Sequence, residues 1–240
     1  AGDLETAQAF ELAEKYFGGL APGPAVPPVS ATAGLTESAT LRLEDRVELP
    51  RVYLSWHSPA MFAKDDAELD VAADVLAHGK TSRLYKTLVY ERRVATDVSA
   101  YQHSREMSGV FQVACTAAAG VSLTELEAAI RAAVAHLASD GVTDAELERA
   151  LAQTEAQFIY RLQTVGGFGG KSDQLNAYNT FVGDPGYFER DRERYVNVTS
   201  KAVALAVSSW LVKAPSVSLS VVPRGRRELA LPGAAEVSVS

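Results

Sequence analysis

The sequence predicts an α+β domain, an antiparallel sheet with helices packed on one of its faces. Segments with strand character occur in neighbouring pairs, at residues 41–50 with 52–59 and at 94–103 with 108–118. Segments with apolar residues at helical spacing follow each pair. Because paired strands are segregated from runs of helices, the expected order β-β-α-α-β-β-α-α-α-α-β is typical of the α+β class.

The strands are predicted from alternation and from turn residues. LRLEDRVELP alternates apolar and polar positions, and VYLSWHSP continues as a second, more buried strand. VATDVSAYQH and SGVFQVACTAA form an expected antiparallel pair, joined through Glu106 to Ser108. SVSLSVVP is the last predicted strand and ends at Pro223.

The helices are predicted from apolar spacing and from their ends. Residues 3–17 form an amphipathic helix followed by two glycines, and acids precede a helix over 66–78. Thr143 and Glu146 form a capping box at the start of a helix over 143–162. Further helices are expected at 82–92, 124–141, 183–195 and 198–212.

Composition divides the chain into a main domain and flanking segments. Four prolines between residues 22 and 28 exclude a helix there and indicate an extended linker. We expect a terminal helix in 1–20, a Pro-rich linker over 21–34, the α+β domain over 35–223 and a solvated tail over 224–240. The sequence does not start with Met, so we expect a piece of a longer polypeptide. Bacterial cytoplasm and periplasm both fit, because export signals can lie outside it.

Charge and cysteine content exclude several classes of function. The chain has 240 residues, 47% of them hydrophobic, enough to fill the core of one large or two small domains. A net charge of −7 argues against nucleic-acid binding, and no apolar run reaches the roughly 18 residues that a membrane helix needs. Cys115 is the one cysteine, which excludes an internal disulfide and favours a buried structural thiol.

Two segments end like a phosphate-binding loop, GKT at residues 79–81 and GKS at 170–172. The loop also needs a glycine five residues before its GK, and Asp74 and Val165 stand there instead. Both segments follow helical patterns rather than a buried strand. We therefore expect no bound nucleotide. Gly79 is predicted to cap the C-terminus of a helix, and residues 166–170 are predicted to be a flexible break between helices.

No set of residues assembles a catalytic site in the sequence. The histidines are not spaced at i,i+4, the spacing that presents two imidazoles to one zinc ion, and structural roles are expected for them. A G-x-S-x-G nucleophile elbow is absent from the sequence. The four histidines are His57, His78, His103 and His136.

Several blocks together resemble a known family. Over residues 1–223 their order and spacing are similar to the C-terminal half of M16 (pitrilysin-type) zinc metallopeptidases, the group that includes mitochondrial processing peptidase. The blocks are GDLETAQAFELAEKYFGGL, LPRVYLSWHSPAM, GKTSRLYKTLVYERRVA, SGVFQVACTAAAG, DGVTDAELERA, DQLNAYNTFVGDPGYFERDRERYVNVT and SLSVVP.

The resemblance implies a chamber enclosed by two similar α+β halves, with residues 1–20 belonging to the preceding half. In the family, an H-x-x-E-H helix of the N-terminal half and a further glutamate hold zinc, and the motif glutamate acts as general base. The matching helix here carries DVAAD, with Asp70 and Asp74 at the histidine positions and Ala73 at the base. We therefore expect no cofactor in this chain and zinc in the catalytic half.

The resemblance also implies a substrate-gripping arginine and tyrosine seven residues apart, and Val89 and Thr96 stand at these positions. Arg92, Arg93 and Tyr101 are the candidate substitutes for binding a peptide substrate, with surface or packing roles as the alternative.

Two functions stay open at this point. The chain is either a non-catalytic half that completes the peptide-binding chamber for an H-x-x-E-H half or subunit, or a structural assembly protein, like the core subunits of respiratory complexes.

Overall fold

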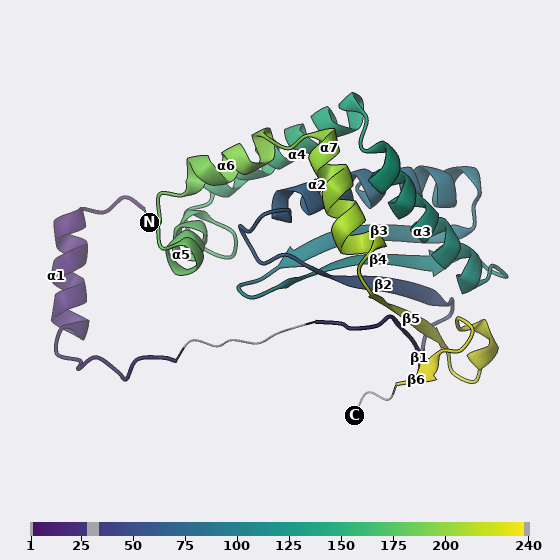
Figure 1. The fold of residues 1–240 in the computed structure, drawn as a ribbon. Coiled ribbons are helices and arrows are strands. Elements are labelled where there is room, and N and C mark those ends of the chain that lie inside the picture. The colour runs from purple at the N-terminus through teal and green to yellow at the C-terminus, as the bar shows by residue number, and fades with distance from the viewer. Residues whose placement is uncertain (1, 28–33, 238–240) are drawn as a thin grey trace. The chain divides into compact units, whose positions relative to one another are not determined.

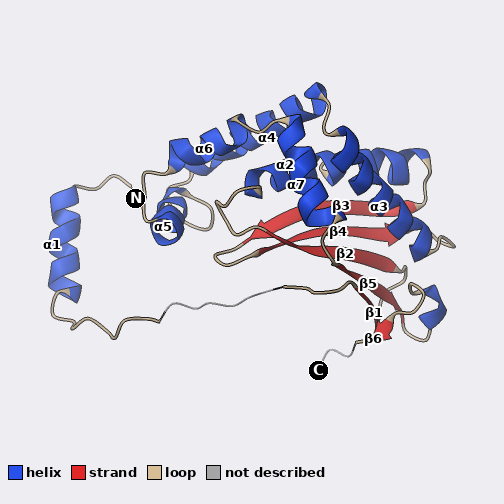
Figure 2. Ribbon diagram, in the orientation of Figure 1, coloured by secondary structure: helices blue, strands red, loops and turns tan. Residues whose placement is uncertain are grey.

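The computed structural model of the chain describes residues 2–27 and 34–237 (Figures 1 and 2). The chain forms two compact units. The smaller contains Ala1–Thr32 and Glu155–Glu189, and the larger contains Ala33–Thr154 and Arg190–Ser240.

The larger unit is built on a sheet with strand order β3-β4-β2-β5-β1-β6 in the described residues. β2 is antiparallel to β4 and β5, and β3 is antiparallel to β4. The strands are β1 Ala39–Asp45, β2 Arg51–Ser58, β3 Ala95–Ser104, β4 Gly109–Ala117, β5 Ser216–Pro223 and β6 Ala235–Glu236.

The sheet departs from the purely antiparallel arrangement at β1. This strand runs parallel to β5 and to β6, and β5 lies between β1 and β2. The last long strand of the chain therefore separates the first two, which the order of strands along the sequence does not reveal. The α+β class itself is confirmed.

Three helices of the larger unit, α2 Asp66–Ala77, α3 Leu123–Asp140 and α7 Ser200–Val207, cover one face of the sheet (Figures 1 and 2). The core lies between them and includes completely buried Leu54, Leu69, Phe111, Ile130 and Val203. Two π-helical turns, η1 Tyr85–Glu91 and η2 Ser208–Val212, stand where ordinary helices were predicted. The opposite face of the sheet carries no helix of the larger unit in the described residues (Figure 2).

The remaining helices are α1 Thr6–Phe17, α4 Asp144–Gln163, α5 Lys171–Val182 and α6 Phe188–Val196. α5 was not predicted. It follows the glycine-rich break, where Asp173 in its first turn accepts the Gly169 N–H at 2.8 Å. Tyr178 is its one buried side chain, so the segment lacks the apolar periodicity by which helices are recognised.

The predicted helix ends at Gly79 and Thr143 are confirmed. Gly79 follows α2 with a φ of 76°, the left-handed conformation that ends many helices. The Thr143 N–H donates to Glu146 Oε2 at 2.9 Å, and the Glu146 N–H donates to Thr143 Oγ1 at 3.3 Å. The same glutamate forms an ion pair with Arg83 at 2.7 Å, which fixes the start of α4 to the segment after α2.

The described part of the segment after Pro223 turns back on β1. It forms the 3-10 turn η3 Arg227–Leu229 and then β6, and Arg42 pairs with Glu236 at 2.9 Å. The arginines of the predicted tail are exposed, while the backbone beyond them pairs with the sheet.

Candidate functional site

Helix α2 carries the residues that stand at the positions of the metal motif. It packs on β3 and α7, and its Asp66, Asp70 and Asp74 lie on one face because they recur every four residues. Asp70 contacts a side chain of α6, and Asp74 contacts His78 at the end of α2.

Asp66 is 2% exposed and fully engaged by hydrogen bonds. Its oxygens accept from the Phe62 N–H at 2.9 Å, from Gln102 Nε2 at 2.6 Å and from the Arg194 guanidinium at 3.1 Å. The guanidinium also lies over the Phe62 ring, 5.2 Å from its centroid. A buried carboxylate with three donors, one of them cationic, ties α2 to β3 and α6.

Asp70 accepts one hydrogen bond, from the Tyr195 hydroxyl at 2.7 Å. Burial raises the pKa of Asp70 to about 7, and the nearby Asp66 and Asp74 carboxylates act in the same direction. The Tyr195 hydrogen bond and the Arg194 charge oppose this rise without cancelling it. Near neutral pH this carboxyl is therefore partly protonated.

Asp74 lies 3.2 Å from His78 Nδ1, one turn further along the chain. Burial raises the pKa of Asp74, and the neighbouring imidazole lowers it. Ala73, at the position of the general base, is a buried methyl group. No group of three or more histidine, cysteine or acidic side chains in the described residues has the geometry of a metal site. The carboxylates of α2 thus connect this helix to β3 and α6.

The three predicted substrate-binding residues do not converge. Arg92 forms an exposed ion pair with Glu125 at 2.6 Å, and Arg93 is exposed with a φ of 54°. Both precede β3, whereas Tyr101 lies within that strand, about 20 Å from its first residue at roughly 3.3 Å per residue. Val89 is partly buried against the core.

Tyr101 belongs to a row of polar side chains on the helix-free face of the sheet. Its hydroxyl donates to Gln112 Oε1 at 2.5 Å, and Gln112 Nε2 donates to Ser55 Oγ at 2.7 Å. The three residues lie opposite one another on β3, β4 and β2, so the hydrogen bonds fix their side chains across three strands.

Strand β5 directs three of its four Val and Leu side chains to this same helix-free face. Ser216, Ser218, Ser220 and Val222 are buried on the helix side, whereas Val217, Leu219 and Val221 point away from the helices. Their partners in the sheet show this orientation, because Leu219 lies opposite Tyr53 and the serines lie opposite core residues of β2. β5 thus places its serines on the helix side, where a strand covered by helices is expected to carry apolar side chains.

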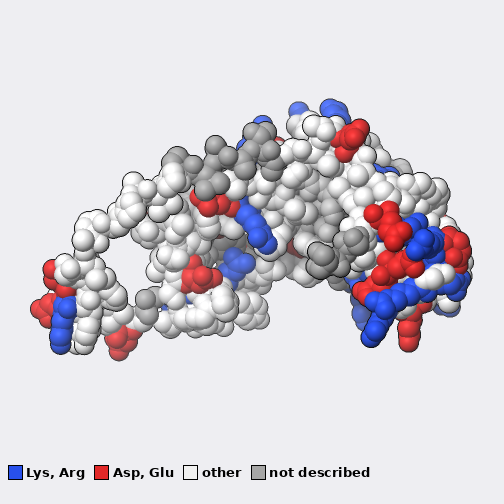
Figure 3. Space-filling model, turned by 90° about the horizontal axis from the view of Figure 1, so that it is seen from below, with Lys and Arg blue, Asp and Glu red and all other residues white. Residues whose placement is uncertain are grey.

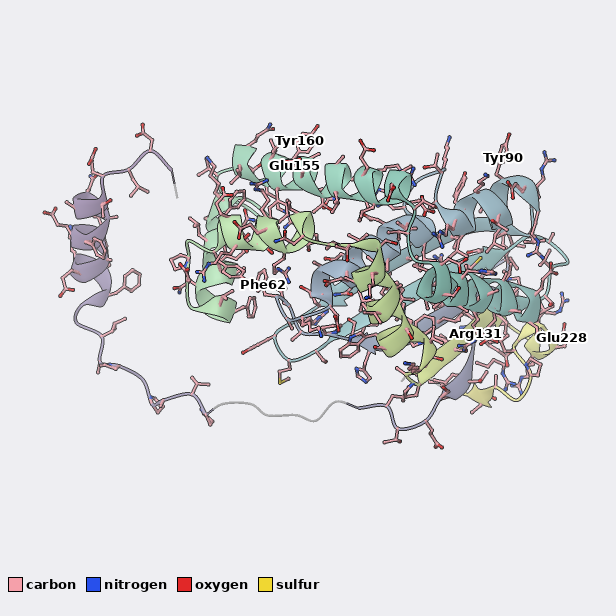
Figure 4. The ribbon with its side chains drawn as sticks, turned by 45° about the horizontal axis from the view of Figure 1, so that its top comes forward. Phe62, Tyr90, Arg131, Glu155, Tyr160 and Glu228 are labelled. Atoms are coloured by element: carbon pink, nitrogen blue, oxygen red, sulfur yellow. The ribbon has the colours of Figure 1, made fainter. Side chains whose placement is uncertain are left out.

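Helix α3 supplies hydrogen-bond partners for Ser216 and Ser218, while Ser220 accepts from the Leu231 N–H at 3.0 Å. Arg131 reaches from α3 toward β5 and donates to Ser216 Oγ at 3.2 Å and Ser218 Oγ at 3.0 Å (Figure 4). Ser218 in turn donates to Glu127 Oε1 at 2.7 Å. Every serine hydroxyl facing α3 therefore has a partner, as buried polar groups require.

The strand β1 extends the apolar part of the helix-free face. Leu41 and Leu43 lie opposite Leu219 and Val221, so an aliphatic strip runs over β5 and β1. We call these side chains, together with Val217, the aliphatic strip. All five are partly buried.

Charges on this face are few. Arg51 and Asp97 lie 3.3 Å apart, and the Arg51 guanidinium lies over the Tyr53 ring, 5.2 Å from its centroid. Seen from below, Lys, Arg, Asp and Glu gather over the end of the sheet near β6 (Figure 3), where Arg42 and Arg227 pair with Glu236 and Glu44. The sequence contains the alternation that separates serines from aliphatic residues on β5, but not which side the helices cover.

Cys115, His57 and His103 lie in the strands of the sheet. Cys115 is buried in β4, and burial raises the pKa of its thiol to about 12, which excludes a reactive thiolate at neutral pH. His57 and His103 lie on the helix-free face, opposite Val110 from either side. Helices long and apolar enough to cross a bilayer do not occur in the described residues.

Comparisons with known proteins extend these observations. The model of the family described as peptidase M16 inactive domain matches residues 1–154. The chain is 28% identical over 167 residues to the zinc protease PqqE of Helicobacter pylori, an alignment that covers 68% of the chain and 38% of that protein.

Solved structures show the same fold. A protease from Helicobacter pylori superposes with a TM-score of 0.79 at 22% identity, over 92% of this chain and 54% of that one. A peptidase M16 inactive domain from Pseudomonas fluorescens gives a TM-score of 0.77 at 18% identity, over 92% and 52%. The chain thus spans about half the length of these structures and less than half of the curated relative.

Proposed function

Because the chain belongs to the family of M16 peptidase inactive domains, we propose that it is the non-catalytic C-terminal half of a zinc metallopeptidase and completes its peptide-binding chamber. The catalytic partner is a homologous half that carries the H-x-x-E-H motif and binds the zinc. It belongs either to the same polypeptide or to a separate subunit. Residues 1–20 form the end of such a half, and 21–34 link it to the domain over 35–223.

The observation that carries the proposal is which residues occupy the metal-motif positions of α2. Its two carboxylates at the motif positions are engaged by Tyr195 and His78, and Ala73 offers no base. A zinc hydrolase needs an open coordination position and a proton acceptor, so hydrolysis must be supplied by another part of the enzyme. The family and the relative named a zinc protease favour a peptidase assembly over a purely structural one.

The helix-free face of the sheet is the surface that this half contributes to the chamber. It offers the hydrogen-bonded row of Tyr101, Gln112 and Ser55, and next to it the aliphatic strip. Extended peptides are recognised by such combinations of apolar contacts and fixed polar groups. Of the three candidate substrate-binding residues, Tyr101 lies on this face, while Arg92 and Arg93 stay candidates at the start of β3.

Reconstitution tests the proposal. The 240-residue chain, its H-x-x-E-H partner and the two together are assayed for peptide cleavage and for bound zinc. We expect no turnover by this chain alone and full turnover only with both parts. Stoichiometric zinc and turnover in the isolated chain would overturn the proposal. Equal activity of the partner without this chain would also overturn it and leave the structural assembly role.

A further inference from the structure

We propose that the helix-free face makes the enzyme selective for peptide segments that are poor in charge and rich in aliphatic side chains. The inference rests on the proposed function and adds a substrate class to it. The occupant is an extended substrate segment, in contact with the aliphatic strip over β5 and β1 and with the polar row over β3, β4 and β2.

The aliphatic strip provides the apolar contact. Leu41, Leu43, Val217, Leu219 and Val221 come from two adjacent parallel strands in register, so their side chains form one continuous surface. Ser216, Ser218 and Ser220 lie on the other side of β5 together with Val222, and all four are buried. Three of the four Val and Leu side chains of β5 therefore lie on the side without helices, which indicates a surface that is covered while the protein works.

The polar row, formed by Tyr101, Gln112 and Ser55, provides hydrogen-bond donors for a peptide backbone. Gln112 accepts from Tyr101 and donates to Ser55, which orients its amide. Within residues 2–27 and 34–237, one further amide hydrogen of Gln112 and the hydroxyl hydrogen of Ser55 have no acceptor, so they can donate to peptide carbonyl groups. Tyr101 is 45% exposed and adds an aromatic edge beside the row.

The charge on the face disfavours ionic side chains in the substrate. Arg51 and Asp97 neutralise each other at 3.3 Å, and the guanidinium is also held over Tyr53. An ionised substrate side chain over the strip would lose water without gaining an opposite charge, which costs free energy. The face thus complements an uncharged segment.

The amount of exposed apolar surface fits a transient peptide better than a permanent interface. On this face the large side chains that are more than a third exposed are Tyr101 and Val110, at 45% and 41% in the described residues. The aliphatic strip itself is only partly exposed. Obligate interfaces bury larger apolar areas with a core of aromatic anchors.

The test uses the assembled enzyme with both halves and two fluorogenic peptides. The peptides share the residues around the scissile bond and differ in a distal segment, which contains Leu and Val in one and Asp and Lys in the other. The variant Val217→Thr/Val221→Thr adds two hydroxyl groups to the strip at nearly constant shape. Val212→Thr, on η2 and 48% exposed, is the matched control.

We expect the unmodified enzyme to cleave the aliphatic peptide with the lower KM. The double variant should raise that KM about threefold to tenfold, because an open face retains part of the roughly tenfold effect of one methylene in a closed pocket. Its kcat, and its KM for the charged peptide, should stay unchanged, as should all constants of the control. Thermal unfolding and size-exclusion chromatography establish that the variant is folded and assembled.

Equal KM values for the two peptides, or an unchanged KM in the double variant, would overturn the inference. Dissociation of the halves in the double variant would also overturn it, by assigning the strip to the interface between them. These outcomes differ from failure of the proposed function, in which the chain is not needed for cleavage at all.

Discussion

Replacing Asp70 by Asn should make the protein more stable above neutral pH and leave it unchanged in acid. The folded protein holds the proton on Asp70 up to a pKa of about 7, whereas an unperturbed aspartate loses it near 3.8. Unfolding between about pH 3.8 and pH 7 therefore releases this proton, and the stability of the unmodified protein falls as the pH rises through this interval. Asn is uncharged at every pH and its oxygen still accepts from Tyr195.

The size of the effect follows from the two pKa values. Each pH unit between them corresponds to about 1.4 kcal/mol, so the interval from 3.8 to about 7 gives an upper limit of about 4 kcal/mol. At pH 8 the Asp70→Asn variant should gain most of this free energy of unfolding. At pH 3.5 the difference should nearly vanish, because Asp70 is then protonated in the folded state and mostly protonated in the unfolded state.

Urea unfolding between pH 3.5 and 8, followed by tryptophan fluorescence, measures the difference. Trp56 and Trp210 both belong to the larger unit, and Trp56 is 2% exposed, so the signal reports the unit that contains Asp70. Asp3→Asn is the control, because Asp3 is exposed and should leave the profile unchanged. A stability difference that is equal at pH 5 and pH 8, or a loss of stability at pH 8, would refute the reasoning.

Three further predictions concern the rest of the fold. Gly109→Ala should cost about 2–3 kcal/mol in chemical unfolding, because its Cβ would lie 2.4 Å from Ser58 Oγ and 2.8 Å from the Ser104 Cα; a change below 0.5 kcal/mol contradicts this. Glu146→Ala should cost about 1–2 kcal/mol at pH 7, because it removes the carboxylate that accepts from the Thr143 N–H and pairs with Arg83. Hydrogen bonding to Arg83 lowers the pKa of Glu146 to about 2. The contribution of Glu146 to the free energy of unfolding is therefore complete above about pH 4.5 and should be lost as the pH drops toward 2. A cost of Glu146→Ala that stays constant down to pH 2 would contradict this. A chelator should leave the Tm of the isolated chain unchanged, and a drop of several degrees would reveal a structural metal.

Local patterns predicted most elements, because each leaves a periodic signal in the sequence. β2 and β4 are apolar at alternate positions that face the helices, and α3 places Leu126, Ile130 and Val134 on its buried face. α5 leaves little such signal, since Tyr178 alone is buried, and it was missed.

The tertiary arrangement of β5 could not be predicted from local pattern. Its alternation of serine with Val or Leu is compatible with either orientation, and the usual assumption places the aliphatic side toward the helices. Contacts with Arg131 and Glu127, more than 80 residues away in sequence, decide the opposite orientation. The candidate site was incomplete for the same reason: Tyr101 was identified, but Gln112 and Ser55 become its neighbours only through pairing across three strands.

The stability network on α2 and the helix-free face lie on opposite sides of the sheet, and this separation has a testable consequence. Asp70 and Tyr195 belong to the helix layer, whereas Leu219 and Gln112 point away from it. Changes at sites that share no partners usually act additively.

In the assembled enzyme, Asp70→Asn should therefore change unfolding at pH 8 while leaving the ratio of KM values for aliphatic and charged peptides as it is. The Val217→Thr/Val221→Thr variant should alter that ratio without altering the pH dependence of unfolding. If Asp70→Asn shifts the KM ratio as strongly as the double variant does, the two faces are coupled through the core, and α2 takes part in substrate selection.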